Sequence, residues 1–246
     1  MAGIPRPLNP SCDEKRTNGL VNMTKEPIII TLDGPAGAGK STITRHLAEQ
    51  LKLDCLDTGA MYRVVAWALH NEKKEQLSGE ELLSFLKDLD FTIEGNGPAQ
   101  KVRVKGRDVS QAIRTPEISQ LASTISLRPE VRSVLAEKQR ALGDRGGLIA
   151  EGRDMGTVIF PQADYKFFLI ASLEVRAERR YKELLERGNA PSLETVKEEM
   201  DARDRQDQER SLAPLKPAPD AFLVDTTHLS LEEVVQTILA RILPER

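Results

Sequence analysis

Cysteine, aromatic residues and long apolar runs are all scarce in this chain of 246 residues. Cys12 and Cys55 are its only cysteines, too few for a disulfide framework or a four-thiolate zinc site, and their scarcity suits a reducing cytosol. No apolar run approaches the roughly 18 residues of a membrane span, and the N-terminus lacks the apolar segment of a signal peptide. We therefore expect a soluble, cytoplasmic protein.

The chain also lacks a strong basic charge. Its formal net charge is −3 and aromatic residues make up 4%, so neither nucleic acid nor a membrane surface is an expected partner. Anionic ligands would instead be bound by local clusters of arginine. The three histidines are dispersed and fit no metal or triad spacing. The length suits one large domain, or one core with insertions.

The apolar pattern predicts an α/β fold. Short apolar runs predict five buried strands, at 28–32, 53–56, 148–150, 165–170 and 221–224. Apolar residues at three- and four-residue spacing predict helices at 39–51, 61–70, 129–142, 173–187 and 231–243. Such alternation is typical of a mostly parallel sheet covered on both faces, which binds ligands at the carboxyl ends of its strands.

Local signals refine this picture. Ser230 with Glu233, and Ser78 with Glu81, match the capping box that begins a helix. Residues 91–94 and 101–104 alternate like strands around the turn-rich segment 95–98, which predicts a small β insertion. Residues 1–26 hold three prolines and no apolar periodicity, so we expect a flexible extension before a single domain at 27–246, with Met23 as a candidate start.

A phosphate-binding loop follows the first predicted strand. The sequence from Gly34 to Ser41 matches the pattern Gly-x-x-x-x-Gly-Lys-Ser/Thr, whose backbone N–H groups cradle a polyphosphate at a helix N-terminus. We expect an exposed Lys40 to hold the β and γ phosphates and Ser41 to ligate Mg²⁺. A plain glycine-rich turn would explain neither residue. The residues predicted to bind ATP here are Gly34, Pro35, Ala36, Gly37, Ala38, Gly39, Lys40, Ser41 and Thr42.

Two more charged clusters follow predicted strands. Residues 57–63 read DTGAMYR, so that Arg63 could reach back over the site. Alternatively, Asp57 or Thr58 could be a plain helix cap with Arg63 in solvent. Residues 151–156 read EGRDMG. Arg153 and Asp154 could line the site, or they could simply form an ion pair with each other.

Two basic segments lie nearer the C-terminus. Arg203, Asp207 and Arg210 share one face of a predicted charged helix, which could also be an ordinary solvated surface. Arg176 and Arg179 lie on the helix after the fourth strand. They could contact ATP as part of a mobile cover that extends to about residue 191, since phosphoryl transfer must exclude water.

From about residue 27 to the C-terminus, the chain closely resembles the bacterial cytidylate kinases, a family of nucleoside monophosphate kinases. The resemblance rests on DTGAMYR, on EGRDMGTVIFP, on the spacing of Arg203, Asp207 and Arg210, and on the following SLAPL. It implies a P-loop kinase fold with a five-stranded parallel sheet flanked by helices, a β insertion in the monophosphate-binding region at about 85–126, and a short lid at about 179–191. It also implies a monomer that uses ATP and Mg²⁺ to phosphorylate CMP and dCMP to CDP and dCDP.

The resemblance also implies roles for single residues. Ser123, Arg132 and Asp154 would contact cytosine. Arg203 and Asp207 would hold the sugar hydroxyls. The α-phosphate would be held by Arg63, Arg153 and Arg210. A carboxylate and a serine oxygen suit the amino edge of cytosine, and a guanidinium suits its acceptor edge. The catalytic residues would be Lys40, Arg153 and Asp154. The CMP-binding residues would be Thr58, Tyr62, Arg63, Ser123, Arg132, Arg153, Asp154, Arg203, Asp207 and Arg210.

Two other functions compete with this interpretation. A P-loop kinase for shikimate, AMP or UMP would share the phosphate loop but leave Ser123, Arg132 and Asp154 unexplained. A regulatory nucleotide switch would need no second phosphate site, and the guanine-specificity motif Asn-Lys-x-Asp is absent from the chain.

Overall fold

The computed structural model describes residues 27–95, 100–186, 188 and 191–243. The predicted extension at 1–26 and most of the predicted turn at 95–98 lie outside these residues. Neither prediction is therefore tested by the structure.

A five-stranded parallel sheet forms the centre of the molecule, in the order β2-β6-β1-β7-β8. All five strands were predicted from apolar runs, and the structure confirms them to within two residues at either end. Such runs are typical of parallel strands that are buried on both faces. Their bounds are β1 Ile29–Asp33, β2 Asp54–Asp57, β6 Leu148–Gly152, β7 Tyr165–Ile170 and β8 Phe222–Asp225.

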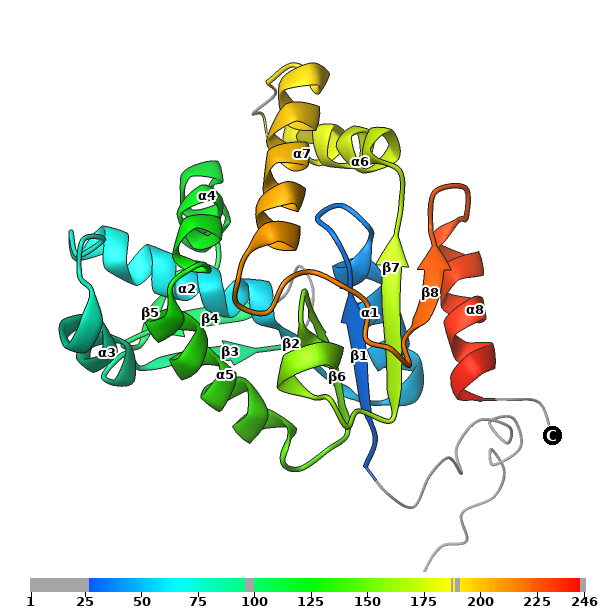
Figure 1. Cartoon of the computed structure of the whole chain (residues 1–246), viewed down its shortest axis with the longest axis horizontal. Helices are drawn as coiled ribbons and strands as arrows, with labels where there is room; N and C mark the ends of the chain where they lie inside the picture. Colours follow the sequence, from blue (N-terminus) through cyan, green and yellow to red (C-terminus); the bar gives the residue numbers. More distant parts are fainter. Residues whose placement is uncertain (1–26, 96–99, 187, 189–190, 244–246) are drawn as a thin grey trace, which may run out of the picture.

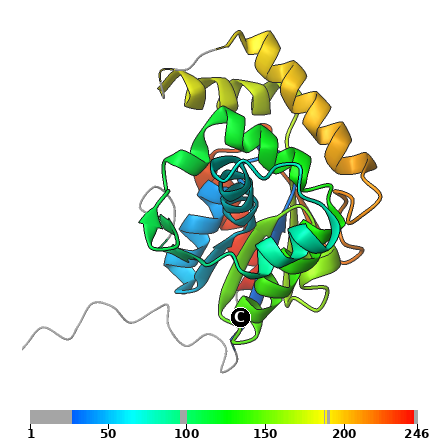
Figure 2. The ribbon, with the colours of Figure 1, turned by 90° about the vertical axis from the view of Figure 1, so that its left-hand side faces the viewer.

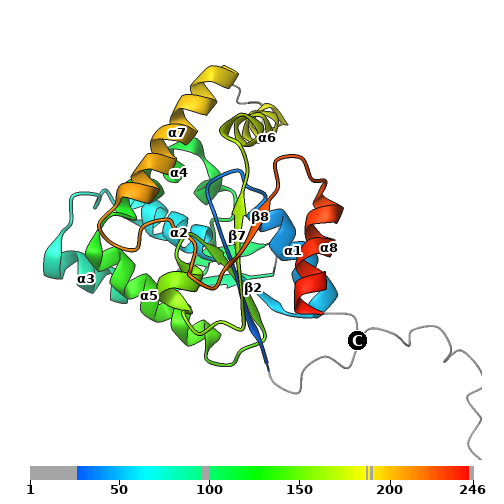
Figure 3. The same ribbon diagram turned by 45° about the vertical axis from the view of Figure 1, so that its right-hand side comes forward.

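Helices cover both faces of the sheet (Figure 3). On one side, α1 (Lys40–Leu51) and α8 (Leu231–Ile242) share a core with Ile30 and Ile149. On the other side, α2 (Thr58–Asn71) and α5 (Pro129–Gly143) pack with α3 (Gly79–Lys87) against Leu148. Leu148 and Ile149 belong to different cores because successive side chains of a strand point to opposite faces.

The predicted β insertion is present after α3. Strands β3 (Phe91–Glu94) and β4 (Lys101–Val104) pair in antiparallel fashion, and a two-residue β5 (Arg107–Asp108) adds to β4. Along β4 the residues alternate between exposed and buried, as expected for a sheet with one face in solvent. The 3₁₀ turn η2 (Ala112–Arg114) and helix α4 (Pro116–Ile125) follow the insertion, and neither was predicted.

Two helices project beyond the carboxyl ends of the strands, α6 (Leu173–Glu186) and α7 (Leu193–Glu209), as Figures 1 and 2 show. A small apolar cluster that includes Ala177 and Met200 holds them together. The C-terminal half of α7 contains the charged segment that was predicted to be helical. A π-helical turn, η3 (Met155–Ile159), follows β6 and was not predicted.

Helix caps confirm one prediction and correct another. Ser230 and Glu233 form a complete capping box at the start of α8. Ser78 precedes α3 but its side chain makes no capping bond, so the capping box predicted there is wrong. A distant carboxylate takes its place, since Glu130 accepts from the N–H of Gly79 at 2.9 Å. Among the helices of the described ranges, none combines the length and apolar character needed to cross a bilayer.

Candidate active site

The phosphate loop, Gly34–Ser41, connects β1 to α1 at the carboxyl edge of the sheet and is wedged between β7 and the α6–α7 pair. Gly34 has φ +145°, and a Cβ there would lie 2.2 Å from the backbone oxygen of Leu169 on β7. Gly37 has φ +74°, and its Cβ would lie 2.9 Å from Cε of Met200 on α7. Only glycine fits either position.

Lys40 points back into this loop. Its Nζ donates to the carbonyl oxygens of Gly34 at 2.8 Å and Pro35 at 2.7 Å. The residue is only 8% exposed, so the expectation of an exposed lysine is wrong. Burial, followed by the charge of Arg153, holds the pKa of Lys40 well below its ordinary value. The ammonium group therefore lies at the centre of the loop and close to the arginines of the neighbouring cluster.

Ser41 faces a carboxylate that sequence reasoning missed. Its hydroxyl donates to Oε2 of Glu151 at 2.8 Å, and Thr58 donates to the backbone oxygen of Glu151 at 2.7 Å. Burial, and then the charge of Asp57, raise the pKa of Glu151 to about 7. A hydroxyl and a carboxylate side by side at the phosphate loop are hard oxygen donors of the kind that Mg²⁺ prefers. An acidic residue at the end of a predicted strand was the available signal.

Asp33, at the end of β1, holds the backbone after the Arg-Asp pair. Its carboxylate accepts from the N–H groups of Met155 at 2.9 Å and Gly156 at 2.8 Å. Burial raises the pKa of Asp33 to about 6, although these two hydrogen bonds oppose the shift. The side chain thus fixes the path of the chain from β6 into the π-helical turn.

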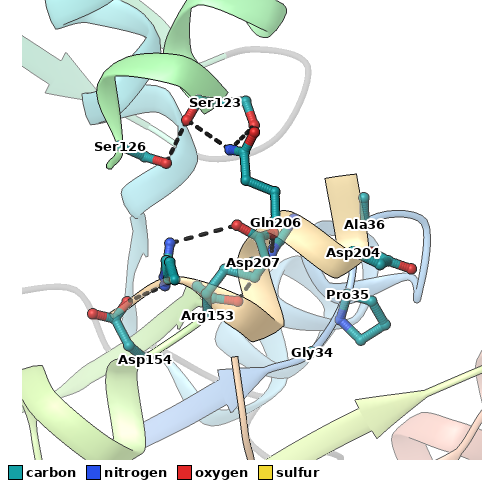
Figure 4. Close-up of polar contacts among 12 residues, drawn as sticks. Gly34, Pro35, Ala36, Ser123, Ser126, Arg153, Asp154, Asp204, Gln206 and Asp207 are labelled. Carbon is teal, nitrogen blue, oxygen red and sulfur yellow. Dashed lines mark hydrogen bonds and ion pairs between the residues drawn. The ribbon is translucent and has the colours of Figure 1, made fainter. Parts of the chain in front are cut away.

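A chain of ion pairs lies beside the phosphate loop. Arg132 of α5 pairs with Asp154, and Arg153 pairs with Asp207 of α7 at 2.9 Å. Arg210 links the two pairs, at 3.4 Å from Asp207 and 3.9 Å from Asp154. Arg153 and Asp154 therefore do not pair with each other, contrary to the simpler alternative. Figure 4 shows Arg153, Asp154 and Asp207 gathered at this point.

The burial of this cluster also decides between the two interpretations of the charged helix. Asp207 is buried, and the side chain of Arg210 is only 5% exposed. The face shared by Arg203, Asp207 and Arg210 is therefore turned toward the protein, and it is not a solvated surface.

Positive charge is in excess within the cluster. Three arginines meet two aspartates in the chain of ion pairs, and Arg203 of α7 adds a further guanidinium. Burial and the charge of Arg153 lower the pKa of Arg203 to about 10. Among the described residues, Nε of Arg63, Nε of Arg203 and Nη2 of Arg210 are buried without a hydrogen-bond partner. Buried donors with surplus positive charge are what a bound anion would satisfy.

Arg63 and Asp57 combine two predicted roles. Asp57 caps α2 by accepting from the N–H of Ala60 at 2.8 Å, and it also pairs with Nη2 of Arg63 at 3.1 Å. The side chain of Arg63 is 24% exposed, so it is not simply a solvent residue. The cap is confirmed, and a ligand role for Arg63 stays a prediction.

The predicted base-recognition residues lie together and are tied to one another. Ser126 donates to the backbone oxygen of Ser123 at 2.6 Å, and Nη1 of Arg132 donates to the backbone oxygen of Ser126 at 3.3 Å. The guanidinium of Arg132 lies 6.0 Å from the centre of the Tyr62 ring. Burial raises the pKa of the Tyr62 phenol to about 12. Burial also raises the pKa of Asp154, although the charge of Arg132 opposes this second shift.

A second residue that sequence reasoning missed is Gln206 on α7. Its Nε2 donates to the backbone oxygen of Ser123 at 3.1 Å and to the Ser123 hydroxyl at 3.0 Å (Figure 4). Gln206 lies three residues after Arg203 and four before Arg210, so helical spacing already placed it near the face of interest.

The arginines predicted to contact ATP are already engaged with the protein. Arg176 is buried and donates to the backbone oxygens of Ala171 and Ala36 and, at 2.5 Å, to Asp204. Arg179 donates to the backbone oxygen and hydroxyl of Thr226. Arg176 does touch the phosphate loop, through Ala36, but contact with ATP stays a prediction for both. Residues 187, 189 and 190 of the lid predicted at about 179–191 lie outside the described residues.

Comparisons with known proteins point to one family. The family model described as cytidylate kinase matches residues 30–243. A cytidylate kinase of Oleidesulfovibrio alaskensis is 45% identical over 217 residues, which cover 88% of this chain and 99% of that protein. A cytidylate kinase of Maridesulfovibrio salexigens is 46% identical over 213 residues, which cover 87% and 95% respectively.

A third cytidylate kinase, from Desulfitobacterium hafniense, is 46% identical over 216 residues, with 88% of this chain and 93% of that protein covered. The family model spans nearly the whole described fold, from β1 to the end of α8. The resemblance found from the motifs is thereby confirmed, and the chain belongs to the cytidylate kinase family.

Proposed function

We propose that this protein transfers the γ-phosphoryl group of ATP to the α-phosphate of CMP or dCMP, giving CDP or dCDP. The observation that carries the proposal is the chain of ion pairs from Arg132 to Arg153, which places surplus guanidinium charge beside the phosphate loop. Two polyanions that react with each other need such a neutralising surface between them. Membership of the family supports the same activity.

The donor ATP would occupy the phosphate loop. The backbone N–H groups of Gly34–Ser41 and the first turn of α1 would hold its phosphates, and Lys40 would exchange its two carbonyl partners for phosphate oxygens. Mg²⁺ fits beside Ser41 and Glu151, whose oxygens lie 2.8 Å apart, and when bound it would neutralise charge on the β and γ phosphates. Thr42 follows Ser41 at the start of α1 and would lie next to the same phosphates.

The acceptor nucleotide would lie across the carboxyl ends of β2 and β6. Arg63, Arg153 and Arg210 would hold its α-phosphate, since Arg63 and Arg210 each carry a buried nitrogen without a hydrogen-bond partner among the described residues. Arg203 and Asp207, one helical turn apart on α7, would hold the sugar hydroxyls. We also propose, from the family resemblance, that the protein acts as a monomer.

The reaction needs no protein nucleophile. The attacking atom is a phosphate oxygen of CMP that is already ionised at neutral pH, so positioning and charge neutralisation would supply most of the catalysis. Lys40 and Arg153 would be the charged groups beside the transferred phosphoryl group. Their proximity is reflected in the effect of Arg153 on the pKa of Lys40.

Cytosine would be read by Asp154, Ser123 and Arg132. Asp154 and Ser123 would accept from the amino group, and Arg132 would donate to the acceptor edge. Uracil would bring a carbonyl oxygen against the carboxylate of Asp154, so UMP should be rejected on the order of 100-fold. Tyr62 and Thr58 would line the same subsite. Because ATP is its donor and cysteine is scarce, we place the protein in the cytoplasm.

The direct test is ADP production from Mg-ATP with CMP, dCMP, UMP, AMP and shikimate supplied separately. We expect turnover mainly with CMP and dCMP. Turnover with UMP, AMP or shikimate instead would identify a different P-loop kinase. Binding of ATP with no turnover on any acceptor, and no saturable binding of CMP, would favour a regulatory nucleotide switch.

A further inference from the structure

Gln206 connects two sides of the proposed acceptor site. It projects from α7, and its side-chain amide meets Ser123 on α4, which lies 83 positions earlier in the chain. Ser123 is buried and Gln206 is half-buried, so the contact is partly shielded from water. Figure 4 shows the side chain of Gln206 extended toward Ser123 above Arg153 and Asp207.

The chemistry of the contact fixes which way the amide faces. The backbone oxygen of Ser123 can only accept a hydrogen bond, so the atom 3.1 Å away must be the amide nitrogen. The same nitrogen lies 3.0 Å from the hydroxyl oxygen of Ser123, and its two N–H groups can serve both acceptors. A reversed amide would bring two carbonyl oxygens together and would be repelled.

This orientation determines what the Ser123 hydroxyl has left for a ligand. One lone pair of its oxygen is used by Gln206, while the second lone pair and the hydroxyl proton have no partner recorded among the described residues. Ser126 and Gln206 between them also hold the Ser123 backbone oxygen. Gln206 thus holds the hydroxyl oxygen in place, and one lone pair and the proton remain for a ligand.

We propose that Gln206 is a positioning residue for base recognition, which acts by holding the hydroxyl of Ser123 in the orientation that contacts cytosine. The inference rests on the proposed function, because Ser123 matters to the base only if CMP is the acceptor. It also gives α7 a part in recognising all three portions of the nucleotide. Arg203 and Asp207 would face the sugar, Arg210 would face the phosphate, and Gln206 would act on the base through Ser123.

The energetic reason is preorganisation. Without Gln206 the Ser123 hydroxyl could turn among its rotamers, and binding of the base would have to restrict it again. Loss of one hydrogen bond of this kind typically weakens an interaction by about 2- to 10-fold. The loss should fall on CMP and leave ATP unaffected, because Gln206 makes no recorded contact with the phosphate loop in the described structure.

The test compares Gln206→Met with Gln208→Met. Methionine is close to glutamine in size and helix propensity but cannot donate to Ser123. Gln208 is the matched control, since it is the same residue type on the same helix and is exposed. For each variant the dissociation constant of CMP is measured by calorimetry and the KM values for CMP and ATP by ADP production. Gln206→Glu, which keeps the length but is an acceptor when ionised, serves as a second variant if Gln206→Met does not fold.

We expect Gln206→Met to weaken CMP binding by about 3- to 10-fold, with the KM for ATP unchanged and Gln208→Met like the parent. In a Ser123→Ala background the same substitution should change CMP binding by less than about twofold, because the hydroxyl it positions is gone. An equal loss in both backgrounds, or parallel losses for CMP and ATP, would show that Gln206 merely supports α7 and would overturn the proposal. The unaltered protein distinguishes failure of the proposed function from failure of the role of Gln206. If the unaltered protein does not bind CMP, the proposed function itself is refuted.

Discussion

Asparagine in place of Asp154 would keep the size of the side chain and remove its negative charge. The carboxylate is 5% exposed and lies between Arg132 and Arg210. A hydrogen bond to a charged group contributes about 1.5–3 kcal/mol, so removing the charged acceptor of the cytosine amino group should lower kcat/KM for CMP by up to about 10- to 150-fold. With UMP the amide of asparagine can donate to the uracil carbonyl, and kcat/KM should stay level or rise.

The substitution also has a cost in stability that must be separated from recognition. It leaves the buried guanidinium of Arg132 without its counter-charge, which typically costs about 3–5 kcal/mol in the free energy of unfolding. Asp204→Asn is the matched control, because Asp204 is similarly buried and forms an ion pair with Arg176 at 2.5 Å. We expect both variants to melt at lower temperature by circular dichroism, and only Asp154→Asn to change the ratio of kcat/KM for CMP to that for UMP.

The decisive quantity is that ratio, measured by ADP production at a temperature where both variants are folded. A fall of at least about tenfold in Asp154→Asn, with no change in Asp204→Asn, is the expected result. An unchanged ratio in Asp154→Asn would refute the assignment of Asp154 to the base. A similar fall in Asp204→Asn would mean that any loss of buried charge near α7 disturbs the acceptor site.

Three further predictions concern the donor side and the core. Lys40→Ala should lower turnover by at least about 100-fold while the circular dichroism spectrum is retained, and Lys87→Ala, at an exposed position of α3, should leave turnover unchanged. Chelation of Mg²⁺ should abolish ADP production, and Ser41→Ala should raise the MgCl₂ concentration for half-maximal turnover by about tenfold; an unchanged requirement would separate Ser41 from the metal. Burial raises the pKa of the Cys55 thiol to about 12, so iodoacetamide at pH 8 should label Cys55 far more slowly in the native protein than in guanidinium chloride. Labelling should accelerate about tenfold per pH unit toward pH 10, and mass spectrometry that finds equal native and denatured rates would contradict the shift.

The sheet and the phosphate loop could be predicted because their signals are local. Each parallel strand is a short apolar run, and the loop is a continuous motif directly after the first of them. Helix α4, strand β5 and the π-helical turn were missed for the opposite reason. Two residues of β5 carry no periodicity, and the turn after β6 depends on the carboxylate of Asp33, which binds the N–H groups of Met155 and Gly156 from 122 and 123 positions away.

Which charged residues pair with each other was harder to predict than which of them lie at the same edge of the sheet. Sequence spacing placed Arg153 and Asp154 side by side, and an ion pair between them was a reasonable alternative. In the fold, Asp154 turns to Arg132 of α5 and Arg153 turns to Asp207 of α7. Adjacent residues at the end of a strand point to opposite sides, and only the packing of α5 and α7 against the sheet edge determines which charge each one meets.

Arg176 illustrates why net charge at a site cannot be read from the number of arginines near it. The sequence places Arg176 on the basic face of α6 beside the ATP phosphates, and the structure does bring it to Ala36 of the phosphate loop. There it is neutralised by Asp204, so it adds little net charge to the loop. Arg203 is different, because its Nε has no hydrogen-bond partner among the described residues, and burial, followed by the charge of Arg153, lowers its pKa. Buried guanidinium charge of that kind favours a bound anion, so we expect the strongest electrostatic attraction on the proposed acceptor side of the site, with Arg176 joining the phosphate loop to α7.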